Sequence, residues 1–467
     1  MYKYLLLAFA ALLTACAPEG QEKALISGQV QGAENILVKL YQEDEFVDST
    51  RTDSTGFFAF AISPKEANYY NLDLEGDKVA LFLDPAHPVS FTADRTDLQT
   101  TLQFEGKTAS LQSFLNNKYQ YQSDAGLMDL KIYKMQPEYA LVHLDSVEPI
   151  LLAQLNEATS QSAVQYEKFS AHEEADIKYS IAIIKQNFPS YHKYYNKVES
   201  VDLPENFNNY QEELSLNENI LVGNSSYENY IMNAMRDDFS AKYDADTTIL
   251  ENQTMVDLNM EWIKSNITAP ELKERISFKV IEEQLKYYGL TDIEPYLEEF
   301  KQNAVKADNV ARVDELAEKW RKIAPGTKSA NFTFLDYAGD STSISTYKGK
   351  YIYVDAWATW CGPCKREIPS LEALQEEFKG EDVVFLSVSL DNEKEDWLAY
   401  VEEHELGGVQ AFADGAFRSK FAEHFFIRAI PRFMLIDPAG KIVNPSMTRP
   451  SNPETKETLS KLLAKEA

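Results

Sequence analysis

Cysteine, histidine and positive charge are all scarce in this sequence. It contains three cysteines and six histidines among 467 residues. A structural zinc site needs four cysteine or histidine ligands. The histidines form no pair with the H-x₃₋₅-H spacing, so zinc binding is disfavoured; they are His87, His143, His172, His192, His404 and His424.

The shortage of positive charge argues against two classes of partner. Lysine and arginine total 45 against 74 aspartates and glutamates, which gives a formal net charge of −29. A chain this acidic repels nucleic acid and anionic lipid headgroups, so we expect neither as a partner. The 26 tyrosines and 25 phenylalanines nevertheless argue against disorder. The sequence shows no internal repeat and no low-complexity tract.

The amino terminus has the pattern of an export signal. Lys3 supplies a positive charge, residues 4–13 are apolar, and Leu-Thr-Ala precedes Cys16. The apolar run is too short for a membrane span and fits a signal peptide. The small residues before Cys16 resemble the lipobox of bacterial lipoproteins, which implies cleavage before Cys16 and its acylation. A cleaved signal with an incidental cysteine is the alternative. No later apolar run approaches the length of a transmembrane helix.

The residues after the signal suggest several domains. Removing residues 1–16 leaves 451 residues (467 − 16), enough for roughly three domains. Residues 17–24 are polar and predict a tether. Residues 25–106 carry short apolar runs separated by turn residues, which predicts a small antiparallel β-sandwich. This stretch also loosely resembles a β domain found upstream of thioredoxin-like domains in exported lipoproteins.

Helical periodicity marks the middle of the chain, residues 107–323. Thr268 to Glu271 has the spacing of a capping box, followed by apolar residues at helical intervals up to Gly289. A second apolar stripe runs from Val310 to Ile323. We expect a helical domain whose aromatic residues form its core, and no chemistry is assigned to it.

The remaining two cysteines form a C-x-x-C motif in residues 326–467. Strands and helices alternate in this part, which predicts an α/β domain. The motif W-C-G-P-C-K at residues 360–365 directly follows the apolar run 351–357. A C-x-x-C at a strand-to-helix junction is typical of a dithiol redox site.

Residues 326–467 resemble the thioredoxin superfamily, most closely the exported TlpA/ResA-like thiol-disulfide oxidoreductases. The matching features are the segment 354–365, Pro369 in the following helix, Pro431 before a strand, and the insertion 392–424. Asn331 follows an alanine where the family usually has a proline. The resemblance implies a thioredoxin fold and no bound cofactor.

The resemblance assigns roles to individual residues. Cys361 is implied as the nucleophile, at a helix N-terminus that stabilises a thiolate. Cys364, expected to be less exposed, would resolve the mixed disulfide, and the two would form a disulfide when oxidised. Asp355, a carboxylate in an apolar strand, is implied as a general base with a raised pKa. Pro431 is implied to be cis.

The same resemblance implies a docking surface and a redox direction. Trp360, Gly362, Pro363 and Ile430 would contact the client. The Gly-Pro pair is typical of reducing enzymes, near about −270 mV in thioredoxin. We therefore expect a lipid-anchored reductase on the periplasmic side of the envelope, at the outer membrane. Its partners would be a disulfide-bonded client protein and a membrane electron donor, and the lipid would be its only membrane attachment.

Several alternatives remain open. The cysteine pair could be a structural disulfide, although so short a loop restrains the unfolded chain little. A peroxiredoxin shares the fold but normally lacks a tight C-x-x-C pair. An oxidant or isomerase of the DsbA type would reverse the redox direction. Finally, the chain could be a partner-binding scaffold lipoprotein in which the dithiol is accessory.

Overall fold

The computed structural model describes residues 24–42, 45–64 and 66–464. The predicted signal, Cys16 and nearly all of the predicted tether lie outside these residues. The chain divides into two compact units, up to Ser240 and from Ala241, within helix α7 (Ser225–Ala245). The domain boundaries drawn from the sequence remain predictions.

The first unit begins with a β-rich region of two four-stranded sheets. The strand orders are β4-β1-β7-β8 and β3-β2-β5-β6. The strands are β1 (Ala24–Gln31), β2 (Leu37–Gln42), β3 (Glu45–Arg51), β4 (Phe57–Ile62), β5 (Asn68–Leu74), β6 (Asp77–Leu83), β7 (Val89–Asp94) and β8 (Gln103–Glu105).

One shared apolar core holds the two sheets of this region. Alternate residues of each strand are buried, as in Ile26 of β1 and Leu40 of β2, and they belong to a single cluster. The expectation of a purely antiparallel region is wrong at one pair, because β1 and β7 are parallel. Parallel neighbours need a long connection, and here the whole second sheet lies between them in the chain.

The helices of the first unit follow the β-rich region. They are α2 (Leu98–Thr101), α3 (Ala109–Asp124), α4 (Pro137–Gln161), α5 (Glu167–Asn196), α6 (Tyr210–Glu213) and α7. Apolar faces of α3, α4 and α5 form one core with Phe82 of β6. Burial of these faces stabilises the helices more than their intrinsic propensity does.

The second unit begins with a helical segment. Its helices are α8 (Ile249–Asn252), α9 (Met255–Asn266), α10 (Pro270–Tyr287), α11 (Glu294–Asn303) and α12 (Ala307–Arg321). The N-cap of α10 is Ala269 and not the predicted Thr268. Pro270 suits the first helical position and starts the helix there, one residue later than the box requires.

A seven-stranded sheet completes the second unit, in the order β10-β9-β13-β12-β11-β14-β15. Its strands are β9 (Thr333–Asp336), β10 (Ser341–Ser343), β11 (Tyr351–Trp357), β12 (Val383–Ser389), β13 (Val409–Phe412), β14 (Arg432–Ile436) and β15 (Ile442–Met447). Its helices are α13 (Gly362–Glu377), α14 (Lys394–His404), α15 (Lys420–His424) and α16 (Pro453–Leu463). The central pair, β11 and β12, is parallel, and β14 pairs antiparallel with β11.

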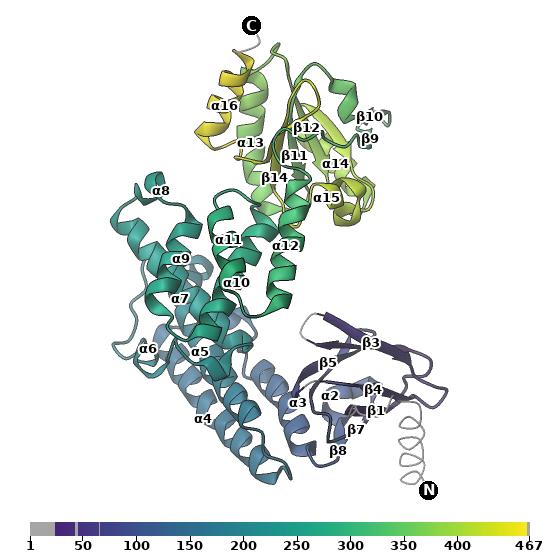
Figure 1. Ribbon diagram of the computed structural model, residues 1–467, viewed down its shortest axis with the longest axis vertical. Coiled ribbons are helices and arrows are strands. Elements are labelled where there is room, and N and C mark those ends of the chain that lie inside the picture. Colours follow the sequence, from purple (N-terminus) through teal and green to yellow (C-terminus); the bar gives the residue numbers. More distant parts are fainter. Residues whose placement is uncertain (1–23, 43–44, 65, 465–467) are drawn as a thin grey trace. The chain divides into compact units, whose positions relative to one another are not determined.

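Helices cover both faces of this sheet, which explains the continuous apolar runs of β11 and β12. On one face, Tyr353 of β11 packs in a cluster with residues of α13 and α16, which lie side by side in Figure 1. On the other face, Val354 shares a core with α10, α11, α12 and α15. The helical segment upstream of the sheet is therefore part of the same core as the sheet.

No helix among the described residues is long and apolar enough to cross a membrane.

Candidate active site

Cys361 and Cys364 lie where strand β11 gives way to helix α13. They form a disulfide, with the two Cα atoms 5.3 Å apart. Cys361 is the N-cap of α13, and its Sγ accepts a hydrogen bond from the backbone N–H of Cys364 at 3.1 Å. The unpaired N–H groups and the dipole of the helix favour negative charge at this end. The position therefore stabilises a thiolate on Cys361 once the disulfide is reduced.

The two cysteines are equally buried, with 4% of each residue exposed. The expectation that Cys364 is the less exposed of the two is therefore wrong for the oxidised form. Both belong to an apolar cluster with Trp357 and Trp397, and Ile430 packs against it. Trp360, by contrast, is 58% exposed beside the pair. An exposed indole next to a recessed disulfide is suited to contact a client chain.

The Gly-Pro pair starts helix α13. Gly362 is the first helical residue and Pro363 follows it in the first turn. Proline is tolerated there because the first N–H groups of a helix have no partner inside the helix. Pro363 is exposed and Gly362 is partly exposed. Pro369 lies inside the same helix.

Asp355 is a buried carboxylate in the middle of β11. Its Oδ2 accepts a hydrogen bond from the Ser387 hydroxyl at 3.4 Å, while Oδ1 has no partner within hydrogen-bond distance. Burial raises the pKa of Asp355 to about 7; the Ser387 hydrogen bond partly opposes this, and Glu367 adds to it. A carboxyl group with a pKa near neutrality can accept and release a proton at physiological pH.

The peptide bond between Ile430 and Pro431 is cis. Pro431 directly precedes β14, the strand that pairs with β11. Ile430 is partly buried and packs against the cluster that contains both cysteines. The residues singled out from the sequence are thus spread over β11, the start of α13 and the loop before β14.

Asp391 is a buried carboxylate that sequence reasoning missed. Its oxygens accept hydrogen bonds from the Thr359 backbone N–H, at 3.1 Å to each oxygen, and from the Thr359 hydroxyl at 2.8 Å. The Ser389 hydroxyl donates to the same carboxylate at 2.7 Å. Asp391 thereby holds the loop between β11 and Cys361. Its place two residues after a buried strand was the available signal, since polar residues at strand ends often serve a site.

Replacing Asp391 with asparagine is expected to destabilise the folded chain. The amide keeps the shape but loses the charge that strengthens three hydrogen bonds, and its NH₂ group faces donors. We expect a loss of about 1.5–3 kcal/mol in the free energy of unfolding, measured by urea denaturation. Asp396→Asn changes an exposed carboxylate and serves as the matched control. Equal stability of the two variants would contradict this role.

Comparisons with known proteins address the same part of the chain. Residues 325–444 match the model of the AhpC/TSA family. The thiol-disulfide oxidoreductase ResA of Bacillus thuringiensis subsp. konkukian is 26% identical over 147 residues, which cover 32% of this chain and 81% of ResA. ResA of Bacillus subtilis is 28% identical over 121 residues, which cover 26% of this chain and 66% of that ResA.

The C-terminal domain is a thioredoxin-like thiol-disulfide oxidoreductase. Among solved structures, the thioredoxin domain of a thiol-disulfide oxidoreductase from Bacteroides vulgatus is 31% identical. The match covers 30% of this chain and 98% of that one, with a TM-score of 0.28. The family model covers residues 325–444, and the two ResA matches cover 32% and 26% of the chain, so the oxidoreductase assignment applies to under a third of it.

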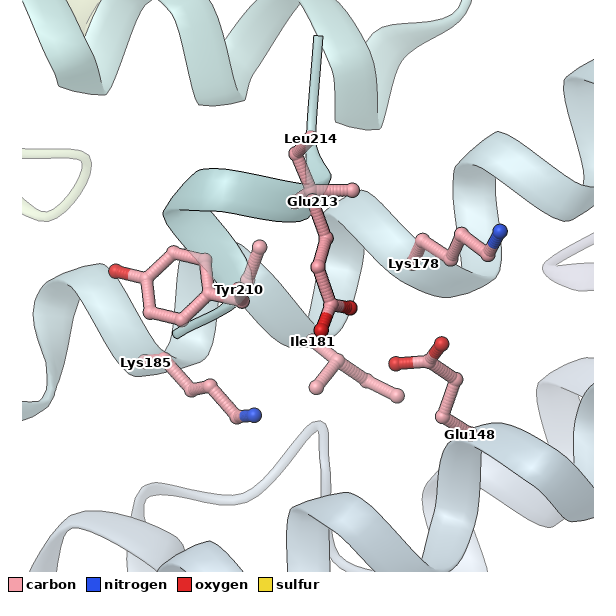
Figure 2. A pocket seen from close by; sticks show the side chains of 8 residues that line it. Glu148, Lys178, Ile181, Lys185, Tyr210, Glu213 and Leu214 are labelled. Carbon is pink, nitrogen blue, oxygen red and sulfur yellow. The ribbon is translucent and has the colours of Figure 1, made fainter. Parts of the chain in front are cut away.

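A separate pocket lies in the first unit between α4, α5 and α6 (Figure 2). Glu148 and Glu213 line it together with Lys178 and Lys185. Both lysines form ion pairs with acids outside the lining, Lys178 with Glu174 at 2.6 Å and Lys185 with Asp145 at 2.7 Å. No cysteine is among the residues that line the pocket.

Among the described residues, no group of three or more histidine, cysteine or acidic side chains is placed to hold a metal ion.

Proposed function

We propose that this protein reduces disulfide bonds of exported client proteins with the Cys361–Cys364 dithiol. The observation that carries the proposal is the cysteine pair at the N-terminus of α13, in a C-G-P-C motif, with Asp355 buried in the preceding strand. The helix end favours a reactive thiolate on Cys361. The Gly-Pro dipeptide favours the reducing direction, as in thioredoxin.

The proposed reaction has two exchange steps. The Cys361 thiolate attacks one sulfur of the client disulfide, which breaks that bond, forms a mixed disulfide and releases a client thiolate. Cys364 then loses its proton to Asp355, directly or through water, and attacks the Cys361 sulfur. The second client thiolate leaves and the Cys361–Cys364 disulfide forms. Two electrons pass from the dithiol to the client, whose thiolates take up two protons.

The remaining assignments extend the same proposal. Acylation of Cys16 would hold the chain at the membrane, because several acyl chains on one residue anchor stably. We place the protein on the periplasmic side of the envelope, at the outer membrane. A membrane electron donor would return the disulfide to the dithiol, since an oxidising compartment otherwise keeps it oxidised. The upstream β-rich region, whose two sheets share one core, would be a sandwich that helps to select the client.

The reduction potential of the Cys361–Cys364 couple tests the proposed direction. Equilibration of the full chain with a dithiothreitol series is expected to give a value near that of thioredoxin, about −270 mV. The Cys364→Ser variant has no couple and provides the baseline. A value near that of DsbA, about −120 mV, would mean that the protein oxidises or isomerises its clients.

A further inference from the structure

Arg432 is a buried arginine that directly follows Pro431. It is the first residue of β14 and is paired with Ala356 of β11. Only 7% of the residue is exposed. Ala356 and Met434 are part of the core that the sheet shares with α10–α12. Because side chains alternate along a strand, Arg432 faces the same helices.

The guanidinium of Arg432 connects three segments of the second unit. Its Nε donates to the Pro445 carbonyl at 3.0 Å, in β15, and its Nη1 donates to the Tyr287 carbonyl at 2.9 Å, at the end of α10. Its Cζ lies 4.6 Å from the centre of the Trp320 ring, on α12. The residue next to Pro431 is therefore fixed by the upstream helices as well as by the sheet.

This arginine is buried without a carboxylate partner in the part of the chain that the structure describes. None of the ion pairs found among the described residues involves it, and its Nη2 has no hydrogen-bond partner. Burial lowers the pKa of Arg432 to about 10. A buried guanidinium that has an unpaired nitrogen and no carboxylate partner is unusual in a folded protein and calls for an explanation.

Trp320, on which Arg432 stacks, is itself fixed. Its Nε1 donates to the Leu285 carbonyl of α10. Its ring packs edge-on against the Phe426 ring, with the two ring centres 6.0 Å apart. A Cβ added to Gly289 would lie 2.9 Å from the Trp320 ring, so only glycine fits beside it. The indole thus forms a rigid platform for the guanidinium.

Ile430 extends this contact to the dithiol. It packs against the core that contains Trp320 and Phe426, and also against the cluster that contains Cys361 and Cys364. Ile430 therefore contacts both the cluster of the redox pair and the core to which α10–α12 belong. Ile430 is one of the residues that the family resemblance implies as client contacts.

We propose that Arg432 is a positioning residue for client binding, which fixes the loop of Ile430 and Pro431 against Trp320 and the end of α10. The helices upstream of the oxidoreductase domain would then be part of its client-binding apparatus. This inference rests on the proposed function, because it requires exchange with a protein disulfide. It makes Arg432 a determinant of reaction with polypeptide substrates and not of thiol reactivity.

The experiment compares two disulfides on the reduced full chain. Insulin offers a polypeptide backbone to the loop, whereas bis(2-hydroxyethyl) disulfide has none. In Arg432→Met, we expect the rate with insulin to fall about 10-fold, equivalent to about 1.4 kcal/mol. We expect the rate with the small disulfide to stay within about twofold. The denaturation midpoint should fall, because the Pro445 and Tyr287 carbonyls lose their donor.

Two further variants complete the test. Arg321→Met makes the same change on α12, where the side chain pairs with Glu318 at the surface, and should leave both rates unchanged. Trp320→Phe gives the guanidinium a smaller ring to stack on and should lower the insulin rate selectively. This variant tests the same contact if Arg432→Met misfolds. Equal loss of both rates, or no loss with insulin, would overturn the inference. Failure of the wild-type chain on both disulfides would instead overturn the proposed function.

Discussion

Replacing Cys361 with serine is expected to reduce disulfide exchange to the uncatalysed background rate. A serine hydroxyl is not ionised near neutral pH and cannot form the mixed disulfide. Insulin reduction by the dithiothreitol-charged full chain is the measurement. The fold should survive, because the disulfide closes too short a loop to add much stability.

Cys364→Ser is the matched partner of this variant and should behave differently. It keeps the nucleophile but cannot resolve the intermediate, so a mixed disulfide between Cys361 and the client should accumulate. Mass spectrometry of the trapped adduct would identify the client in cells. If cells carrying Cys361→Ser show no defect where loss of the whole chain does, the protein acts as a binding scaffold and the dithiol is accessory.

Asp355→Asn is expected to stabilise the protein at neutral and alkaline pH while slowing exchange. The unfolded aspartate has a pKa near 3.8, and burial raises it to about 7 in the folded chain. Below the unfolded value both states are protonated and no stability is lost. Between pH 4 and 7 the unfolded aspartate is ionised while the buried one keeps its proton, so the free energy of unfolding falls with rising pH. The loss levels off at about 4 kcal/mol above pH 7. Asparagine carries no such cost.

The pH dependence provides the measurement for Asp355. The free energy of unfolding of Asp355→Asn minus that of wild type should be smallest near pH 4 and grow up to about pH 7–8. Exchange with insulin should slow by about 100-fold or more, because the general base is gone. Asp414→Asn replaces an exposed carboxylate and should show neither effect. A stability difference that does not vary with pH would mean that Asp355 is ionised throughout.

Local patterns in the sequence were enough to locate the redox pair and much of the sheet. The apolar runs at residues 351–357 and 383–389 became the two central parallel strands. The C-x-x-C motif fell at a strand-to-helix junction, where helix geometry fixes its surroundings. These features are determined by residues close together in the sequence. The periodicity of apolar residues therefore predicts them directly.

Long-range packing could not be predicted in the same way. The apolar stripe ending at Ile323 indicated a buried face but not that the oxidoreductase sheet would cover it. Arg432 and Asp391 look like surface residues in the sequence, because charged side chains usually are. Their partners Tyr287 and Thr359 lie far away in the chain. The parallel pairing of β1 with β7 is non-local for the same reason.

The shared core of α10–α12 and the oxidoreductase sheet also bears on how such a chain can evolve. Side chains such as Leu316 and Trp320 belong to the same buried cluster as Met434 and Ile436, and tightly packed interiors tolerate little change of volume. A larger residue on the sheet would need a smaller one on the helices. Recombination that exchanged the oxidoreductase domain alone would place a new sheet against the unchanged α10–α12 helices, with side chains that are not complementary in volume. An exchange of the oxidoreductase domain alone would therefore have to preserve the fit of the sheet to these helices.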